Sequence, residues 1–396
     1  MTHQTSNAAC VAIALLGGGL SLLASHGAQA MNFNIPTSAS IESAQMGGAS
    51  LAFPQSSMIA SDNPAGMAML GNRTDAGLQL FLAHFRSSFG NDNNRDDFKV
   101  AAPIPSGGFN WRASDRLSLG LSMYSVGSGV DYDHAAVPGQ GFPAAKTKVA
   151  FLNFAPTLAY KLTPDFSLGV SALIGVQHLQ ARGMVAPQAD GSLGLLPAHG
   201  VSTNMGYGAR VGALWNIDPH FSVGASWSPK MRFGQADGYK DDLLAGAGGH
   251  LDLPEQYGVG VAVHLTPELT VAADYLRIEW SHVGFLNDPQ GAGLRSQNVY
   301  RVGAAWRALP SLTLRAGFKQ ASRAVDSDHT AANYFSPGIL DNSISSGFSW
   351  QATASTDLSL GWEYHLPQTV RGTGPSTGSN LSAHYSQVLL GVGMRF

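Results

Sequence analysis

The stretch Tyr257-Gly258-Val259-Gly260-Val261-Ala262-Val263-His264-Leu265 alternates strictly between large apolar and smaller residues. Successive side chains of a β-strand point to opposite faces, so this stretch predicts a strand with one apolar and one small-residue face. The same alternation recurs over residues 166–177 and 358–366. Charged residues make up only 12% of the chain, too few for a soluble all-β protein with a solvated outer face. The small-residue face therefore predicts a crowded lumen.

Six short turns divide residues 113–357 between such strands. Pro and Asp suit these positions, because Pro presets φ and Asp bonds locally to the backbone. The connections between consecutive turns are longer and rich in Gly, Pro and Asp. Short turns at one end and long loops at the other are typical of an outer-membrane β-barrel. The turns are Ser114-Asp115, Thr163-Pro164-Asp165, Asp218-Pro219-His220, Thr266-Pro267-Glu268, Leu309-Pro310-Ser311 and Ser355-Thr356-Asp357.

Fourteen antiparallel strands are predicted. An even number leaves both chain ends on the periplasmic side, and closure leaves no unpaired strand edge in hydrocarbon. Four aromatic residues near turns, Trp111, Tyr160, Trp215 and Trp306, predict an interfacial girdle. The predicted strands are 75–89, 98–112, 116–131, 148–162, 165–183, 201–217, 220–235, 253–265, 268–281, 298–308, 311–321, 339–354, 357–367 and 383–396.

The first thirty residues predict a signal peptide. Residues 11–24 form an apolar run that is too short to span a bilayer, and Ala28-Gln29-Ala30 matches a cleavage site. Residues 1–10 depart from this pattern, because they contain no Lys or Arg. Cys10 is the only cysteine, so the mature chain is expected to have no disulfide and no thiol chemistry.

Residues 31–74 do not alternate, and they precede the predicted barrel of residues 75–396. They carry little charge and consist largely of small residues around Asn63-Pro64-Ala65. A segment of this kind predicts a small helical hatch that folds into the lumen and plugs it; a flexible periplasmic tail would be more polar. The net charge of −3 gives no indication of a nucleic-acid partner.

The chain resembles the FadL-type outer-membrane transporters of long-chain fatty acids and their aromatic-hydrocarbon relatives. The resemblance is carried by Asn63-Pro64-Ala65-Gly66-Met67, by Leu253-Pro254-Glu255-Gln256-Tyr257-Gly258-Val259-Gly260 and by Tyr300-Arg301-Val302-Gly303-Ala304. It implies a monomeric barrel in the outer membrane, surrounded by lipid, that takes up hydrophobic molecules passively. It further implies capture by the loops, a pocket above the hatch, and lateral exit at a kinked third strand.

Two sets of residues are candidates for this transport path. Gly127-Ser128-Gly129 in the third strand would form the lateral gap, because glycine tolerates a break in pairing. Apolar residues in two loops would bind the ligand first, although packing within the loops is an equally good interpretation of them. These loop residues are Met184, Val185, Leu193, Leu195, Leu196, Leu243, Leu244 and Leu251.

Four lumen-facing cations bear on the identity of the cargo. The alternation places Arg301 and Lys319 near the extracellular ends of their strands, and Arg210 and Arg315 nearer the middle. A carboxylate that enters a pocket of low dielectric needs a charged partner or a proton, whereas a hydrocarbon needs neither. Fatty acids are the preferred cargo, with aromatic or alkane hydrocarbons as the alternative. The cations could instead pair with Asp274 or Glu363.

Other classes of function receive less support. Gly374-Pro375-Ser376-Thr377-Gly378 has the spacing of a hydrolase nucleophile motif, but it lies in a loop between strands rather than at a strand-to-helix turn. The 13 histidines are dispersed, so neither an enzyme, a metal site nor a cofactor is predicted. A general porin would need an open, charged lumen. A surface adhesin or phage receptor could use the same barrel.

Overall fold

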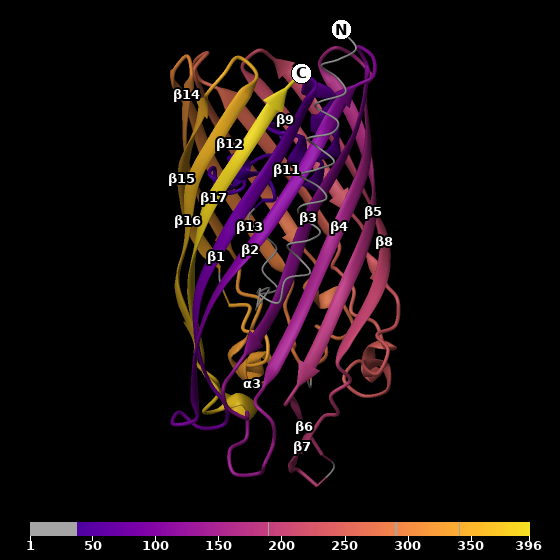
Figure 1. Ribbon diagram of the computed structural model, residues 1–396, viewed down its shortest axis with the longest axis vertical. Helices are drawn as coiled ribbons and strands as arrows, with labels where there is room; N and C mark the ends of the chain where they lie inside the picture. The colour runs from indigo at the N-terminus through magenta and orange to yellow at the C-terminus, as the bar shows by residue number, and fades with distance from the viewer. Residues whose placement is uncertain (1–37, 189, 290, 340) are drawn as a thin grey trace.

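The computed structural model describes residues 38–396 except 189, 290 and 340, and these residues form a closed antiparallel barrel of fourteen strands (Figure 1). Each strand pairs with its neighbours in the chain, β1 pairs with β17, and β8 pairs directly with β9. The predicted barrel is therefore confirmed. Its strands are β1 (Arg73–Ser88), β2 (Arg95–Arg112), β3 (Leu117–Asp131), β4 (Lys146–Lys161), β5 (Phe166–Arg182), β8 (Val201–Asp218), β9 (Phe221–Ser228), β11 (Gln256–His264), β12 (Leu269–Ile278), β13 (Gln297–Leu309), β14 (Leu312–Ala321), β15 (Asn342–Gln351), β16 (Thr356–Val370) and β17 (Leu381–Arg395).

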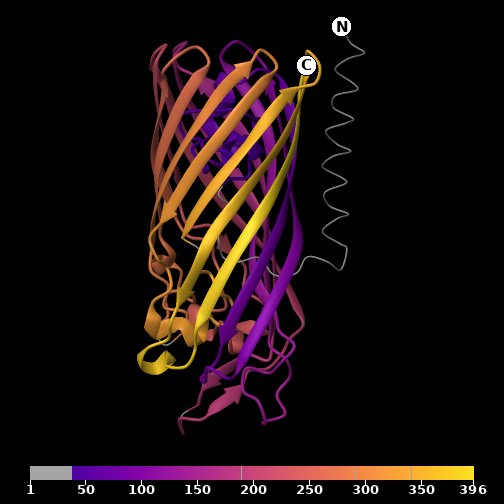
Figure 2. The same cartoon turned by 90° about the vertical axis from the view of Figure 1, so that its left-hand side faces the viewer.

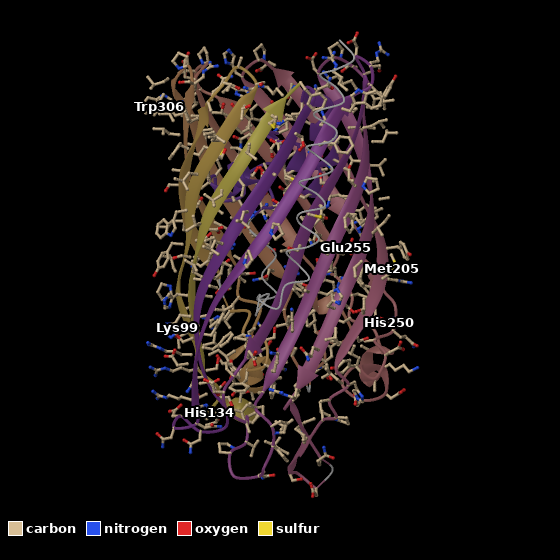
Figure 3. The ribbon with its side chains drawn as sticks, viewed as in Figure 1. Lys99, His134, Met205, His250, Glu255 and Trp306 are labelled. Atoms are coloured by element: carbon tan, nitrogen blue, oxygen red, sulfur yellow. The ribbon has the colours of Figure 1, made fainter. Side chains whose placement is uncertain are left out.

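The two ends of the barrel differ as the turn pattern predicts. The short turns and the C-terminus lie at one end, and the long loops lie at the other (Figures 1 and 2). The loop end carries the hairpin of β6 (Val185–Pro187) and β7 (Leu193–Leu195) and the helix α3 (Thr330–Asn333). The four predicted girdle residues are all exposed, and Figure 3 shows Trp306 at the turn end.

One predicted strand is wrong over half its length. Strand β9 ends at Ser228 rather than continuing to 235, because Pro229 follows and cannot donate a ladder hydrogen bond. The chain then turns into the lumen, and β10 (Arg232–Phe233) pairs briefly with β8. Met231 and Phe233 fill the space that the wall glycines Gly175 and Gly206 leave free.

Residues 38–70 lie inside the turn-end half of the barrel (Figure 2). They form α2 (Ile41–Ala44) and the 3-10 helices η1 (Ser57–Ser61) and η2 (Pro64–Met69). None of the helices in the described part of the chain is long and apolar enough to cross a membrane. Residues 31–37 of the predicted hatch, and the predicted signal peptide, lie outside the described residues.

Wall side chains bind the backbone of this segment, which we call the hatch (residues 38–70). Asp274 Oδ2 accepts from the amides of Ser50 and Leu51 at 2.8 and 3.2 Å. Asp75 Oδ2 accepts from Ser57 N at 2.7 Å. Buried hydrogen bonds to charged groups contribute about 1.5–3 kcal/mol each, so the hatch is held at several independent points.

Asn63 joins the hatch to itself and to the wall. Its Nδ2 donates to Leu51 O at 2.7 Å and to Ala213 O at 3.0 Å. Its Oδ1 accepts from Ala65 N at 3.1 Å and so caps η2, whose first residue is Pro64. Proline suits this position because the first helical amide has no intrahelical partner.

Lumen-facing glycines let the hatch approach the wall backbone. A Cβ at Gly224 would lie 1.9 Å from Leu51 O, and one at Gly317 would lie 2.0 Å from Met46 C. Both atoms belong to the hatch backbone and cannot rotate away as a flexible side chain could. The excess of glycine in the chain is thus explained in part by contact between two backbones.

We expect Gly224→Ala combined with Gly317→Ala to displace the hatch, because both methyl groups would overlap its backbone. The displacement should raise ion conductance in planar bilayers. Gly71→Ala is the matched control, since no atom lies within 4 Å of its added Cβ. Wild-type conductance of a correctly folded double variant would contradict this account of the glycines.

Candidate functional site

The loop half of the lumen contains a cavity of about 740 Å³. Cavities of about 300–1,000 Å³ are typical of small-molecule sites. The structure brings seven of the eight predicted loop residues to this one cavity. Leu195 is the exception and is exposed on β7. The seven are Met184, Val185, Leu193, Leu196, Leu243, Leu244 and Leu251.

The rest of the lining comes mainly from β4, β5 and other loops. Trp280, in η5 (Trp280–His282), is buried and donates from Nε1 to Gln297 Oε1 at 3.0 Å. Phe335 follows α3 and stacks edge-on against Tyr334. A large aromatic residue inside a loop was a signal for Phe335, whereas Trp280 fell at the end of the predicted strand 268–281, which in the structure ends at Ile278. Asp328 also lines the cavity, and its hydrogen bond with His329 lowers the pKa of this carboxyl.

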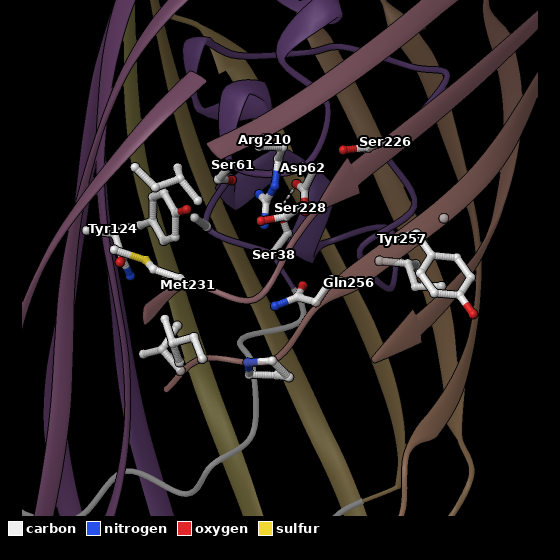
Figure 4. Close-up of a pocket in the computed structure, with 18 of the residues that line it drawn as sticks. Ser38, Ser61, Asp62, Tyr124, Arg210, Ser226, Ser228, Met231, Gln256 and Tyr257 are labelled. Atoms are coloured by element: carbon white, nitrogen blue, oxygen red, sulfur yellow. Dashed lines mark hydrogen bonds between the residues drawn. The ribbon is translucent and has the colours of Figure 1, made fainter. Parts of the chain in front are cut away.

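A second, smaller cavity, which we call the inner cavity, lies on the loop side of the hatch and has both apolar and polar lining residues (Figure 4). Arg210 of β8, Asp62 of the hatch and Ser228 of β9 converge there. Arg210 is 8% exposed, and its Nη1 has no hydrogen-bond partner among the described residues. The amide of Asn153, which also lines the cavity, has no partner for either Nδ2 or Oδ1 among them. This cavity therefore offers unused donors for a polar ligand group.

The other predicted cations contact groups of the protein itself. Arg301 borders the same cavity; its Nη1 donates to Gly48 O of the hatch at 3.2 Å and lies 3.9 Å from Asp62 Oδ1, while its Nε has no hydrogen-bond partner among the described residues. Lys319 Nζ lies 4.0 Å from Glu363 Oε1. This ion pair is the predicted alternative to ligand binding by Lys319. Arg315 Nε donates to Gln55 Oε1 at 2.7 Å. Arg315 lines a separate cavity at the turn end, together with Glu42 of the hatch.

Strand β3 pairs unequally with its two neighbours. It pairs with β4 along its whole length but with β2 only as far as Met123, which lies opposite Gly107. Beyond that point β2 pairs with β1 alone. We call the unpaired stretch between residues 95–106 of β2 and 124–131 of β3 the seam. Gly127-Ser128-Gly129 lies within the seam and remains paired with β4.

Two prolines mark the β2 side of the seam. Pro103 and Pro105 lie in the part of β2 that has a partner on one side only. A proline nitrogen cannot donate to a ladder, so proline within a sheet is confined to unpaired edges and bulges. The Pro-Ile-Pro sequence was therefore a signal for the β2 side of the seam, beside the glycines on its β3 side.

The seam adjoins the inner cavity directly and the large cavity through a loop. Tyr124 and Val126, the lumen-facing residues of β3 where its pairing with β2 ends, line the inner cavity. Further toward the loop end, Ser128 Oγ hydrogen-bonds Ser336 Oγ, and Tyr132 OH donates to Tyr334 O at 3.0 Å. Phe335 and Ser336 line the large cavity. The loop after β14 thus lies between the large cavity and the seam.

Ser376 has no catalytic surroundings in the described structure. It ends the short helix η7 (Gly374–Ser376), donates from Oγ to Asp328 O at 2.7 Å and accepts from Ala331 N at 3.1 Å. These bonds connect two loops. They give the hydroxyl a structural role.

A closed barrel with exposed apolar walls, an internal hatch and an apolar cavity defines an outer-membrane transport channel. Residues 21–396 match the family described as outer membrane protein transport protein (OMPP1/FadL/TodX), and the chain belongs to this family. The family is a transport family for hydrophobic compounds. The comparison with curated proteins gives no match.

Solved structures share this fold at low sequence identity. The P. putida toluene transporter TodX superposes with a TM-score of 0.69 at 17% identity, over 90% of this chain and 98% of that chain. The Ralstonia pickettii toluene transporter TbuX gives 0.64 at 18%, over 91% and 99%. A Pseudomonas aeruginosa FadL homologue gives 0.69 at 17%, over 92% and 100%.

We expect Leu193→Ala combined with Leu196→Ala to weaken the binding of a long-chain alcohol to the purified protein. Each change removes apolar lining, and a loss of about 1 kcal/mol per residue gives roughly a 30-fold weaker affinity. Leu195→Ala is the matched control on the same hairpin, because Leu195 does not line the cavity. Calorimetric titration measures the difference. Equal losses for the control would favour loop packing over ligand binding.

Proposed function

We propose that this protein takes up long-chain fatty acids passively across the outer membrane. The ligand is captured in the large cavity, passes to the inner cavity above the hatch and leaves sideways through the seam. The observation that carries this proposal is the inner cavity, which borders an unpaired strand edge and is lined by an arginine with an unused donor.

Two successive sites suit transport better than one. Burial of a methylene stabilises by about 0.8 kcal/mol, so a 16-carbon chain in a single apolar site would gain roughly 12 kcal/mol. A ligand bound that tightly would leave slowly, whereas weaker sites in sequence allow passage. Leu251 lines the outer cavity and Leu253 lines the inner one, so the segment at 251–253 separates them.

Arg210 is the residue that favours a carboxylate over a hydrocarbon. Its buried guanidinium keeps a donor free in a cavity that also contains the unpartnered amide of Asn153. A buried polar group without a partner costs stability, and a ligand carboxylate would satisfy it. An uncharged hydrocarbon would leave both groups unsatisfied.

Lateral exit agrees with how firmly the hatch is bound. Asp274, Asp75 and Asn63 hold it by hydrogen bonds to separate parts of its backbone. Passage through the hatch would break these bonds together, whereas the seam already lacks strand pairing. A hydrophobic ligand that leaves through the seam enters hydrocarbon directly.

We expect Arg210→Met to weaken oleate binding about 10- to 100-fold, since one charge-assisted hydrogen bond is worth about 1.5–3 kcal/mol. Binding of oleyl alcohol, which has the same chain without a charge, should change far less. Methionine retains the apolar volume of the arginine stem. Titration of the purified protein with both ligands measures the difference.

Arg315→Gln is the control for that measurement, because it removes a buried cation from the far side of the hatch. It should leave the ratio of oleate to alcohol affinity unchanged. Equal losses of both ligands in Arg210→Met would show that no carboxylate is bound there. Uptake of an uncharged hydrocarbon would then be the better proposal. TodX and TbuX, which share the fold, are named as transporters of such a compound, toluene.

We expect Pro103→Val combined with Pro105→Val to slow uptake. The change supplies two amide donors at the seam edge and favours continued pairing of β2 with β3. Gly129→Val would be a poor test, because a Cβ there would lie 2.2 Å from Thr147 O and disturb β4 instead. Uptake of labelled oleate by cells measures the effect. Pro156→Val, in β4, is the control; an equal effect of both variants would argue against exit through the seam.

Three further parts of the proposal concern the chain as a whole. Residues 1–30 act as the export signal, residues 31–74 act as the plug, and the barrel works as a monomer. The fit of residues 38–70 inside the barrel supports the second of these. N-terminal sequencing of the purified protein tests the first.

A further inference from the structure

The outer wall of the barrel carries two groups of cations near the loop end. The β1–β2 cluster contains Arg86, Arg95 and Lys99 around one carboxylate, Asp97. The β4–β5 cluster contains Lys146, Lys148 and Arg182 around one carboxylate, Asp131. Each cluster thus has three permanent cations and a single acid.

The strand registers place the members of each cluster side by side. Arg86 lies opposite Asp97, and its Nε is 3.2 Å from Asp97 Oδ2. Lys146 lies opposite both Asp131 and Arg182. Like charges directly across a strand pair destabilise it. Lys99, Lys148 and Arg182 have no ion pair with a carboxylate in the part of the chain that the structure describes.

All these side chains point away from the lumen. Arg95, Asp97 and Lys99 alternate along β2 with the buried residues Asp96, Phe98 and Val100. Lys146 and Lys148 alternate in the same way with Thr147 and Val149, which line the large cavity. Figure 3 shows Lys99 projecting from the outer surface, far from the turn end that Trp306 marks. The clusters therefore face the membrane environment.

Their depth matches the outer edge of the hydrocarbon layer. Lys99 is twelve residues from the girdle position Trp111 along β2, and Lys148 is twelve residues from Tyr160 along β4. At about 3.4 Å per residue and a tilt of about 40°, this is roughly 31 Å along the barrel axis, against an apolar band of about 25 Å. Both lysines thus lie just outside the hydrocarbon, at the level of outer-leaflet headgroups.

We propose that the two clusters bind the phosphate groups of the phosphorylated glycolipid of the outer leaflet. Phosphate supplies the anions that Lys99, Lys148 and Arg182 lack within the protein, and clusters of Lys and Arg at a membrane surface attract anionic headgroups. β2 and β3 border the seam, so one cluster lies on each side of it. A lipid bound at both clusters spans the loop end of the seam.

Lipid binding to the purified full barrel with its hatch tests this proposal. The probes are bisphosphorylated lipid A, the same lipid after removal of its phosphates, and phosphatidylethanolamine, each titrated in detergent and followed by native mass spectrometry. Arg86→Ala with Lys99→Ala, and Lys146→Ala with Lys148→Ala, remove two cations from each cluster. Each pair should weaken binding of bisphosphorylated lipid A roughly 30-fold, at about a factor of five per cation.

Arg112→Ala combined with Arg307→Ala is the matched control, because these exposed cations lie at the turn end. This control variant should bind lipid A as the wild type does. With the dephosphorylated lipid, the wild type and the cluster variants should no longer differ in binding. Equal binding of dephosphorylated lipid or of phosphatidylethanolamine to the wild type would overturn the proposal. So would an equal loss in the turn-end control. Retained resistance of the folded barrel to unfolding in SDS shows that a variant has folded.

Discussion

A backbone amide or carbonyl that meets hydrocarbon must have a hydrogen-bond partner, since no water is present to supply one. Closure of the β1–β17 and β8–β9 pairs satisfies this requirement around almost the whole barrel. Pairing stops at the seam between β2 and β3, and it also stops along β8 beyond Val211, where only the short β10 pairs with the second edge among the described residues. At the seam, Pro103 and Pro105 reduce the cost, because each removes a donor that would otherwise be unpaired. An opening in the wall is therefore built into the sequence of β2, and the inner cavity borders it from inside.

The lumen follows from a second constraint, which is space. Fourteen strands enclose more volume than their own side chains fill, and small lumen residues leave room for further chain. The hatch occupies the turn-end half, where Gly224 and Gly317 allow its backbone to touch the wall. Met231 and Phe233 fill the region over Gly175 and Gly206. What remains is a large apolar space under the loops and a small space above the hatch that Arg210 lines, and this order suits a ligand with a long chain and one charged end.

Much of this architecture could be predicted from the sequence, because alternation and turn residues are local signals. The outward face of β11, the turn at Thr266-Pro267-Glu268 and the Asn63-Pro64 cap are of this kind. The leucines of the loops also came together in one cavity. Pairing partners are not local. Gly127-Ser128-Gly129 does lie within the seam, but the glycines alone did not show that β2 is the missing partner. Lys319 could not be distinguished from Arg210, because its partner Glu363 comes from β16, a different strand. Pro229 was a signal that β9 ends at Ser228. The strand was nevertheless predicted to continue to 235, because apolar and polar residues still alternate beyond the proline.

The central claim is that cargo leaves through the seam while the hatch stays in place, and locking the hatch tests it most directly. Ser122 Oγ on β3 donates to the backbone O of Ser57 in the hatch at 3.1 Å, so Ser57→Cys with Ser122→Cys introduces two thiols at neighbouring residues of the hatch and the wall. Cys10, the only cysteine of the chain, lies within the predicted signal peptide. We predict that oleate uptake is the same with the engineered disulfide oxidised or reduced. Uptake that is lost on oxidation and restored by a reductant would show that the hatch must move, and would contradict lateral exit.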